Sequence, residues 1–460
     1  MSANTTTASD LPTNQPLNKL NQFDVTILVI SFVVGMGIFG TPARVAAAAG
    51  SPTLFFSVWL VGGFVALCGA LTYAEIGLRL PAMGGYYKIF SFCYHPSVGF
   101  TINTLILISN AASLAVVALI GADYISDLLY GKPSGTLFNT MVAVVCVGAF
   151  FVVNLLGLRT SSRTQNVLMV LKIGLMVIMI ASIIKGVTVA PHGHDANIQV
   201  YDFKDNHWLK LFLIACIPVF FSYGGYQQTI NFGTEVKRTN ILSKGIVSGM
   251  VIVVALYMAI NYAYTEVIGF DEMKGTSAIG ALLLEAWFGT TGAKIFDGLM
   301  FLSVLAYVNV VLLSNPRVMR AMSLDKVFPK MFAYQHPKTQ VMINGLAAFS
   351  IMTIIITFFG KQVDNILGFT MFLDSFGMGA SAATLFYLRK KKQNETAIAK
   401  GFIKTITPLL TAIFVLAYAG IATAVIIDKP TAAIIGICLL GTLAIIYFLV
   451  YHKKSAVNNF

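Results

Sequence analysis

The segment that decides the fold is Val33-Val34-Gly35-Met36-Gly37-Ile38-Phe39-Gly40-Thr41-Pro42, inside the first long apolar run of the chain. Three glycines fall within six positions, where a membrane helix is normally regular and apolar. Glycine stabilises helices poorly and lets a ligand approach the backbone closely. Unwound backbone at membrane depth is tolerated only where protein buries it or a cavity lines it. We therefore predict a helix break at residues 35–37 that lines a binding site.

The second half of the chain contains a counterpart, Phe220-Phe221-Ser222-Tyr223-Gly224-Gly225-Tyr226, again inside an apolar run. Glycine-interrupted apolar segments at corresponding places in two halves of a chain are a sequence pointer to the binding site of a transporter. Close helix packing through small residues explains either segment alone about as well. Two matching breaks favour the binding site.

Composition places the chain in the membrane. Of its 460 residues, 57% are hydrophobic and only 11% charged, a balance that excludes a soluble domain. Apolar runs long enough to cross a bilayer recur along the whole chain. They predict an all-α integral membrane protein with about twelve spans, near residues 24–46, 52–79, 97–129, 137–157, 164–186, 208–233, 242–268, 292–322, 340–360, 364–389, 405–427 and 430–452.

The parts outside the spans are short. Residues 1–22 are rich in Ser, Thr and Asn, and we expect them to be disordered and cytoplasmic. Residues 23–455 are expected to form one transmembrane domain, and residues 278–288 a short amphipathic helix in an outer loop. The first apolar run is expected to be a span and not a cleaved signal peptide, because it is long and carries the glycine break.

Charge and cysteine placement support this topology. Of the 31 lysines and arginines, 21 fall in segments on the N-terminal side of the membrane, nine on the other side, and Lys172 within a span. This bias predicts that both termini are cytoplasmic in a plasma membrane, as in a bacterial inner membrane. The net charge of +12 then reflects orientation and not nucleic-acid binding. Five scattered cysteines predict neither a disulfide nor a thiol metal site.

Several blocks of the sequence resemble the amino acid–polyamine–organocation superfamily of transporters, and within it the L-type amino acid transporters and their bacterial relatives. The blocks are Gly35-Met36-Gly37-Ile38-Phe39, Thr41-Pro42, Gly50-Ser51-Pro52, Tyr73-Ala74-Glu75, Phe221-Ser222-Tyr223-Gly224-Gly225-Tyr226, Glu235-Val236-Lys237 and Arg317-Val318-Met319-Arg320-Ala321-Met322, with Asp325 and Pro329. The resemblance covers the first eight spans by motif and the last four by hydropathy. It implies a LeuT-type five-plus-five inverted repeat, residues 24–186 and 208–389, plus two further helices at 405–452, with helices 1 and 6 broken.

An unwound break exposes free N–H groups at the start of one half-helix and free carbonyls at the end of the other. These ends suit the carboxylate and the ammonium of an amino acid. The resemblance implies that Met36 and Gly37 bind the carboxylate through N–H groups, and that carbonyls of Val33, Phe221 and Gly224 bind the ammonium. Phe221 also matches the gating aromatic of the family. The implied substrate site comprises Val33, Gly35, Met36, Gly37, Ile38, Phe221, Ser222, Gly224 and Gly225.

Lys172 lies well inside the fifth span. Ionisable residues within a membrane are costly and default to a functional hypothesis. The resemblance implies that its ammonium replaces the sodium ion of sodium-coupled relatives and ties span five to unwound span one. The alternative is a lysine that reaches the cytoplasmic interface with its flexible stem.

Other polar residues give weaker signals. Asp374 in span ten is a proton-coupling carboxylate, a contact for a substrate side chain, or, as the sequence alone favours, a residue paired inside the protein or facing a wet cavity. Asn110, Tyr307 and Asn309 are candidate pocket or packing residues. Glu75 and Glu235 are expected to form ion pairs near the inner side. The polar loop holding His192, His194 and Asp195 is expected to be solvated and to bind no metal.

The sequence predicts sodium-independent transport of L-amino acids, neutral ones in preference, by exchange or proton-linked uptake. Alternatives are a sensor or channel of similar architecture, or a transporter of polyamines or cationic amino acids. A membrane enzyme would need clustered catalytic residues, which the sequence does not show, and we expect no cofactor. The loop at residues 130–135 lacks the cysteine through which animal L-type transporters link to a heavy chain, so we expect no covalent heavy chain. Gln227 and Gln228 depart from the animal pattern and leave the substrate range open.

Overall fold

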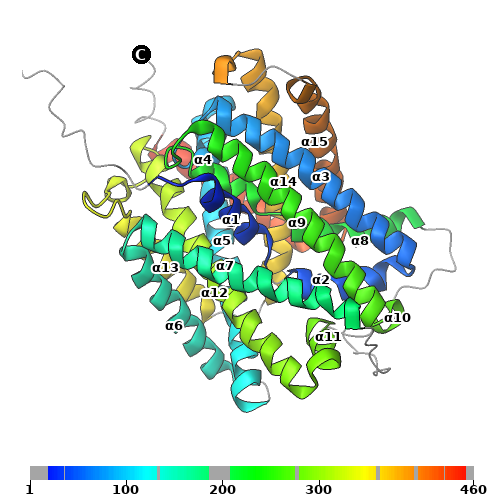
Figure 1. Ribbon diagram of the computed structural model, residues 1–460. Helices are drawn as coiled ribbons and strands as arrows, with labels where there is room; N and C mark the ends of the chain where they lie inside the picture. The colour runs from blue at the N-terminus through cyan, green and yellow to red at the C-terminus, as the bar shows by residue number, and fades with distance from the viewer. Residues whose placement is uncertain are drawn as a thin grey trace, which may run out of the picture.

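The computed structural model describes residues 19–35, 37–131, 135–185, 208–274, 279–358, 363–397, 402–428 and 430–451. Within these residues the chain is helical (Figure 1). In the described part of the chain, eight helices are long and apolar enough to cross a membrane, and a ninth span arises if the bent pair at the N-terminus counts as one. The prediction of an all-α membrane protein is confirmed.

The first predicted span is two helices, α1 (Gln22–Val33) and α2 (Gly37–Ala49), bent by 44° at the break. Asn21 begins α1 with a reciprocal cap, because its side chain accepts from the Asp24 amide and Asp24 accepts from the Asn21 amide. The sixth predicted span is also interrupted: α8 (Trp208–Tyr223) is followed by Gly224, Gly225 and a short 3₁₀ helix, η2 (Tyr226–Asn231). Both predicted breaks are present in the backbone.

Each remaining predicted span contains a helix. They are α3 (Pro52–Arg79), α5 (Pro96–Tyr130), α6 (Thr136–Leu155), α7 (Leu158–Ala181), α9 (Thr239–Val267), α12 (Thr290–Leu324), α13 (Ile343–Thr357), α14 (Val363–Lys390), α15 (Phe402–Asp428) and α16 (Pro430–Val450). Proline at the first position of α3 and α5 suits a helix start, where its missing N–H is not needed. The helix expected in the outer loop is α11 (Ile279–Phe288). The described residues also contain three further 3₁₀ turns (Ser182–Lys185, Lys330–Ala333, Glu395–Ala397) and α10 (Phe270–Met273).

Two features differ from the sequence-based expectation. Residues 85–93 lie outside every predicted span, yet they form a helix, α4 (Gly85–Cys93). Residues 19–22, expected to be disordered, are held in place: Leu20 is buried, its amide donates to the Glu235 carbonyl (2.8 Å) and its carbonyl accepts from the Lys237 amide (3.1 Å). The rest of the tail, residues 1–18, lies outside the described residues.

The broken first span lies in the middle of the bundle. In Figure 1, α1 is at the centre, between α7 and α9, while α3 runs alongside α9. Almost every residue from Val25 to Val34 is less than 8% exposed, whereas α16 faces outward along most of its length. A helix buried on all sides has no face for lipid, which suits a helix that lines an internal site.

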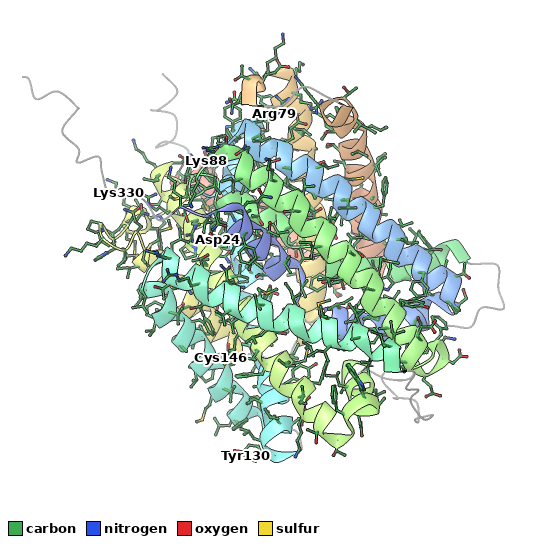
Figure 2. The ribbon with its side chains drawn as sticks, viewed as in Figure 1. Asp24, Arg79, Lys88, Tyr130, Cys146 and Lys330 are labelled. Carbon is green, nitrogen blue, oxygen red and sulfur yellow. The ribbon has the colours of Figure 1, made fainter. Side chains whose placement is uncertain are left out.

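Basic residues gather at one end of the bundle. Figure 2 shows Lys88 and Lys330 at the upper left, Arg79 in the upper middle, and Tyr130, at the end of α5, at the bottom of the view. We name the end with these three residues the basic end; Arg317 and Arg389 belong to it as well. The sequence assigns these basic residues to segments on one side of the membrane, and the structure brings them together.

Candidate functional site at the two helix breaks

The two breaks pack directly against each other. A Cβ atom added at Gly37 would lie 3.0 Å from the Ser222 hydroxyl oxygen, and one at Gly225 only 2.4 Å from the Phe32 carbonyl oxygen. Gly225 also has φ +108°, a conformation that favours glycine. A glycine of each break therefore packs against a residue of the other break, as expected if the two breaks form one site.

Lys172 reaches the first break. It is 1% exposed, and its ammonium donates a hydrogen bond to the carbonyl of Val34. The side chain crosses from α7 to the unwound segment between α1 and α2, so it does not extend to a lipid interface. A buried ammonium needs such an acceptor, because desolvation without one is costly.

Tyr257 on α9 bridges the two breaks. Its hydroxyl lies 3.0 Å from the Val33 carbonyl oxygen and 3.1 Å from the Ser222 carbonyl oxygen. A phenol has one proton, so it donates to one of these two carbonyls at a time and leaves the other available. The ring is fully buried against Trp59 and Tyr223, with centroid separations of 5.9 and 5.0 Å.

Sequence reasoning did not find Tyr257. A signal existed, because a tyrosine in the middle of an apolar span must find a partner for its hydroxyl. The chain contains 18 tyrosines, however, and nothing in the sequence says which of them points at the breaks. Only the packing of α9 against α1 identifies this one.

The remaining groups of the predicted substrate site lie at the same place. Ile38 is fully buried, whereas Gly35, Gly37, Phe221, Gly224 and Gly225 are partly accessible. The Val33 carbonyl also accepts from the Gly35 amide (2.7 Å), and the Phe221 carbonyl from the Gly224 amide (3.1 Å). Met36 lies outside the described residues. The first turn of α2 begins at Gly37, and N–H groups of a first helical turn have no partner within their own helix.

The four other polar candidates separate into two groups. Asn309 is fully buried and its amide is used in a network: it donates to Gln165 (2.7 Å) and to the Ser161 carbonyl (3.1 Å) and accepts from Asn154 (2.9 Å). This network joins α6, α7 and α12, and such a satisfied network stabilises packing. Both donor positions of the Asn309 amide are therefore used within the protein.

The second group stays partly accessible. Asn110 on α5 donates to the Asn315 side chain (2.8 Å), and the Tyr307 hydroxyl lies 3.1 Å from that of Ser113. Asp374 on α14 is partly exposed and forms none of the ion pairs found in the described part of the chain.

The basic end is held by ion pairs. Glu75 accepts from Arg79 (2.7 Å) and from Arg389, which joins α3 to the end of α14. Glu235 binds Arg317 through two hydrogen bonds of 2.8 and 2.6 Å. The expectation that Glu75 and Glu235 form ion pairs is confirmed. Where both partners are nearly buried, as here, breaking one side leaves an uncompensated charge and is strongly destabilising.

A further ion pair joins α4 to the end of α12 at the basic end. Lys88 lies 2.6 Å from Asp325, which also accepts from the Tyr87 hydroxyl (3.0 Å). Burial, and after it the negative charge of Asp325, raise the pKa of Tyr87 well above its usual value, so the phenol stays a donor. Together these contacts close the basic end around the start of α1, where Leu20 pairs with the segment after η2.

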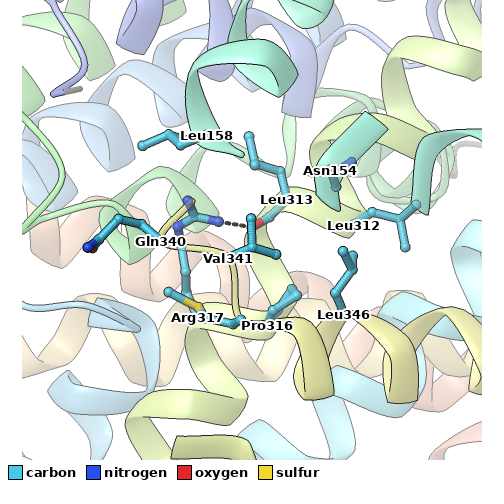
Figure 3. A pocket seen from close by; sticks show the side chains of 10 residues that line it. Asn154, Leu158, Leu312, Leu313, Pro316, Arg317, Gln340, Val341 and Leu346 are labelled. Carbon is cyan, nitrogen blue, oxygen red and sulfur yellow. Dashed lines mark hydrogen bonds between the residues drawn. The ribbon is translucent and has the colours of Figure 1, made fainter. Parts of the chain in front are cut away.

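The hollow in Figure 3 is not the candidate site. It lies between the end of α6, the start of α7, α12 and the start of α13. Its lining includes the polar side chains of Arg317, Asn154 and Gln340. Arg317 donates there to the Leu313 carbonyl, drawn as a dashed line, while its other nitrogens bind Glu235. None of the residues predicted for the substrate site lines it.

The described residues contain no group of three His, Cys, Asp or Glu side chains that would hold a metal ion. The five cysteines are free. The predicted solvated loop with His192, His194 and Asp195 lies outside the described residues, as do residues 132–134 of the loop between α5 and α6.

Several known amino acid transporters are similar to this chain. The serine/threonine exchanger SteT of Bacillus subtilis is 26% identical over 80% of this chain and 82% of its own length. The human large neutral amino acids transporter small subunit 2 is 26% identical over 94% of this chain and 81% of its own. The branched-chain amino acid permease BcaP of Bacillus subtilis is 28% identical over 70% of each chain. The family model described as amino acid permease matches residues 20–457, and the chain belongs to the amino acid permease family.

Proposed function

We propose that the chain is a secondary transporter of neutral L-amino acids that works by alternating access without sodium. The observation that carries this proposal is the contact between the two breaks, with the Lys172 ammonium on the Val34 carbonyl. An ammonium at that carbonyl supplies a positive charge to the unwound segment, as a bound sodium ion would. Transport proceeds by exchange or by proton-linked uptake.

The proposed architecture is twelve spans in a LeuT-type five-plus-five inverted repeat, with α15 and α16 as two further helices. Support comes from the breaks at corresponding places, between α1 and α2 in one half and after α8 in the other. In such folds discontinuous helices meet at the substrate near the bilayer midplane. The basic end then faces the cytoplasm of a plasma membrane, together with both termini.

Substrate binding uses the free backbone groups of the breaks. The N–H groups at the start of α2 bind the α-carboxylate, and the dipole of that helix favours a negative charge there. The α-ammonium binds carbonyls of Val33, Phe221 and Gly224. Tyr257 adjusts to it by donating to Ser222 when Val33 is occupied, because its hydroxyl lies within reach of both carbonyls. Phe221, partly accessible beside the second break, covers the bound substrate.

The names of the similar proteins support the substrate class. One is a serine/threonine exchanger, one a transporter of large neutral amino acids and one a branched-chain amino acid permease. The partners proposed here are the amino acid and the lipid bilayer. A heavy chain linked through the loop at residues 130–135 is not proposed, because that loop has no cysteine.

A channel or a sensor is the competing function. Two discontinuous helices that pack on each other favour an occluded substrate over an open pore. Uptake of radiolabelled amino acids into proteoliposomes, with and without amino acid inside, tests the proposal. We expect saturable uptake that is stimulated by internal amino acid and unchanged when choline replaces sodium at constant pH. Analogues that lack the α-amino or the α-carboxyl group should not compete.

Gly37→Val tests whether the break is the site. A β-branched side chain there meets the Ser222 hydroxyl and fills the space of the ligand. We expect binding to be lost, with the protein still monodisperse in detergent. Gly40→Ala is the matched control on the same helix, because among the described residues nothing beyond its own helical turn and chain neighbours lies within 4 Å of the added methyl group. Normal affinity in Gly37→Val would show that the substrate binds elsewhere.

A further inference from the structure

Asp374 is a carboxylate enclosed by the bundle. It lies near the middle of α14, and its side chain is partly exposed although Phe372, Leu373 and Ser375 beside it are 4–6% exposed. It interacts electrostatically with the phenols of Tyr86 and Tyr418, both of which are buried. The accessible part of the carboxylate therefore faces the interior of the bundle and not the lipid.

Within the described part of the chain, phenols and no cation surround this carboxylate. The ionisable groups that interact with it electrostatically are Tyr86 on α4, Tyr307 on α12 and Tyr418 on α15. From α5 the nearby polar group is Ser113, bonded to Tyr307, and α16 places Gly436 against Phe372. In the ranges that the structure describes, no lysine, arginine or histidine forms an ion pair with Asp374.

An ionised carboxylate inside a membrane is costly unless a positive charge compensates it. Since the described residues offer Asp374 no such partner, the compensation must come from a proton or from a cationic ligand. The residues one and two turns further along α14 indicate which of the two, a proton or a cationic ligand, compensates the charge.

A row of hydroxyl groups begins one helical turn from Asp374. Gly377, Met378 and Ser381 lie three, four and seven residues later, so they share a face of α14 with it. The Tyr86 hydroxyl lies 3.2 Å from a Cβ position on Gly377 and 3.3 Å from the Ser381 hydroxyl. The Ser381 hydroxyl is in turn 2.5 Å from that of Tyr73 on α3.

This row leads toward the basic end. Both α3 and α14 end there, where Glu75 of α3 binds Arg389 of α14. A chain of hydroxyls transfers protons, because each group accepts one proton and donates another. No larger cation can move along such a path through buried side chains.

We propose that Asp374 is a proton-binding site that couples amino acid uptake to proton entry, with Tyr86, Ser381 and Tyr73 as its route to the basic end. The inference rests on the proposed transport function and specifies its coupling ion. With the site open to the outer solution, a carboxylate oxygen of Asp374 takes a proton and forms an O–H bond. With the site open inward, that O–H bond breaks and the proton leaves along the hydroxyls, which are unchanged after its passage. One proton thus accompanies each amino acid.

The test uses the full-length protein in proteoliposomes with the membrane potential clamped at zero. An inward proton gradient should drive accumulation of the amino acid in the wild type, and a pH dye trapped inside should report acidification when the amino acid is added. Asp374→Asn should lose both signals at least tenfold while it keeps amino acid exchange, which needs no net proton movement. Asp271→Asn is the matched control, because that carboxylate is 91% exposed in a loop helix.

Ser381→Ala interrupts the hydroxyl row without removing the acid. It should slow acidification severalfold, with exchange unchanged, and it carries the test if Asp374→Asn does not fold. Undiminished acidification in both variants would overturn the proposal. So would an Asp374→Asn protein that only binds amino acids with a side-chain ammonium less tightly, since that identifies a cationic ligand.

Failure of the proton site and failure of the proposed function give different results in this experiment. If the wild type exchanges amino acids but shows no proton-driven accumulation, the proposed proton site is wrong and the proposed transport function still holds. If the wild type neither exchanges nor accumulates amino acids, the proposed transport function itself is wrong.

Discussion

The two helix breaks share a role but are held open by different means. At the first, the carbonyls of Val33 and Val34 bind side chains from other helices, Tyr257 of α9 and Lys172 of α7. At the second, the Gly225 amide donates to Gln227 only two residues away (2.9 Å), and the Phe221 carbonyl accepts from Gly224. The first break is thus held by two side chains from other helices, whereas the second combines these local contacts with the shared hydroxyl of Tyr257 at the Ser222 carbonyl.

Glycine has a different task at each break. Among the described residues, apart from its chain neighbours, Gly35 has only the Val33 carbonyl oxygen near an added Cβ, at 3.9 Å, an ordinary contact distance. Gly225 combines a positive φ with a Cβ position 2.4 Å from the Phe32 carbonyl oxygen. The first break thus tolerates a small side chain at Gly35, whereas the second requires glycine at Gly225 for both conformation and space.

The largest effect expected from this difference is that of Gly225→Ala. Backbone strain and overpacking each cost about 1–3 kcal/mol, so we expect a loss of about 3 kcal/mol or more in stability. The measurement is thermal unfolding in detergent, together with the yield of monodisperse protein. Gly35→Ala is the matched variant at the first break and should unfold close to the wild type. Equal losses in the two variants would remove the distinction drawn between the breaks.

Lys172→Ala should have the next largest effect, and it changes a contact of the first break alone. It leaves the Val34 carbonyl without its donor, and a hydrogen bond to a charged group contributes about 1.5–3 kcal/mol. We expect transport to fall by roughly tenfold or more, since each ~1.4 kcal/mol is a factor of ten. Expression should fall less, because removing a buried charge offsets part of the loss. Initial rates of uptake, normalised to protein in the vesicles, measure it.

Two further variants make this test specific. Lys294→Ala removes an exposed lysine on α12 and should transport normally. Lys172→Arg keeps a charge that does not dissociate, so retained transport would assign Lys172 a structural role, whereas lost transport would point to proton release from it. Full activity in Lys172→Ala would contradict the proposed tie between α7 and the first break.

Tyr257→Phe should have a smaller effect, because it removes one hydroxyl shared between two carbonyls. A neutral hydrogen bond contributes about 1 kcal/mol, which corresponds to about a fivefold change in substrate affinity. Equilibrium binding of labelled substrate in detergent measures it. Tyr223→Phe is the control from the same aromatic cluster, since its hydroxyl makes only a 3.5 Å contact with the Trp59 carbonyl. A larger loss of substrate affinity in Tyr223→Phe than in Tyr257→Phe would show that the Tyr257 hydroxyl is not the group that bridges the two breaks.

Gln227→Ala should be the smallest of the four. It removes a contact between neighbouring residues at the second break, where the glycines already set the backbone, so we expect a change of about twofold in affinity. The same binding measurement applies. A loss as large as that of Tyr257→Phe would mean that the second break depends on the Gln227 side chain as much as on Tyr257.

Much of the fold was predictable from local pattern. Apolar runs located the helices, because a membrane helix needs a long uninterrupted apolar segment. Residues 85–93 escaped prediction because a nine-residue helix is too short to contain such a run. Leu20 escaped because its order comes from pairing with residues 235–237, more than 200 positions away.

The sequence by itself determined that this is a helical membrane protein with two glycine breaks, because hydropathy and glycine content act locally on the backbone. It also singled out Lys172, since a charge in an apolar run is costly wherever it points. Only the tertiary structure decided which carbonyl that charge binds, that Tyr257 joins the breaks, that Asn309 is used in packing, and that Asp374 faces phenols and no cation among the described residues. These outcomes depend on which helix faces lie together, and helix packing is set by the whole bundle and not by any one segment.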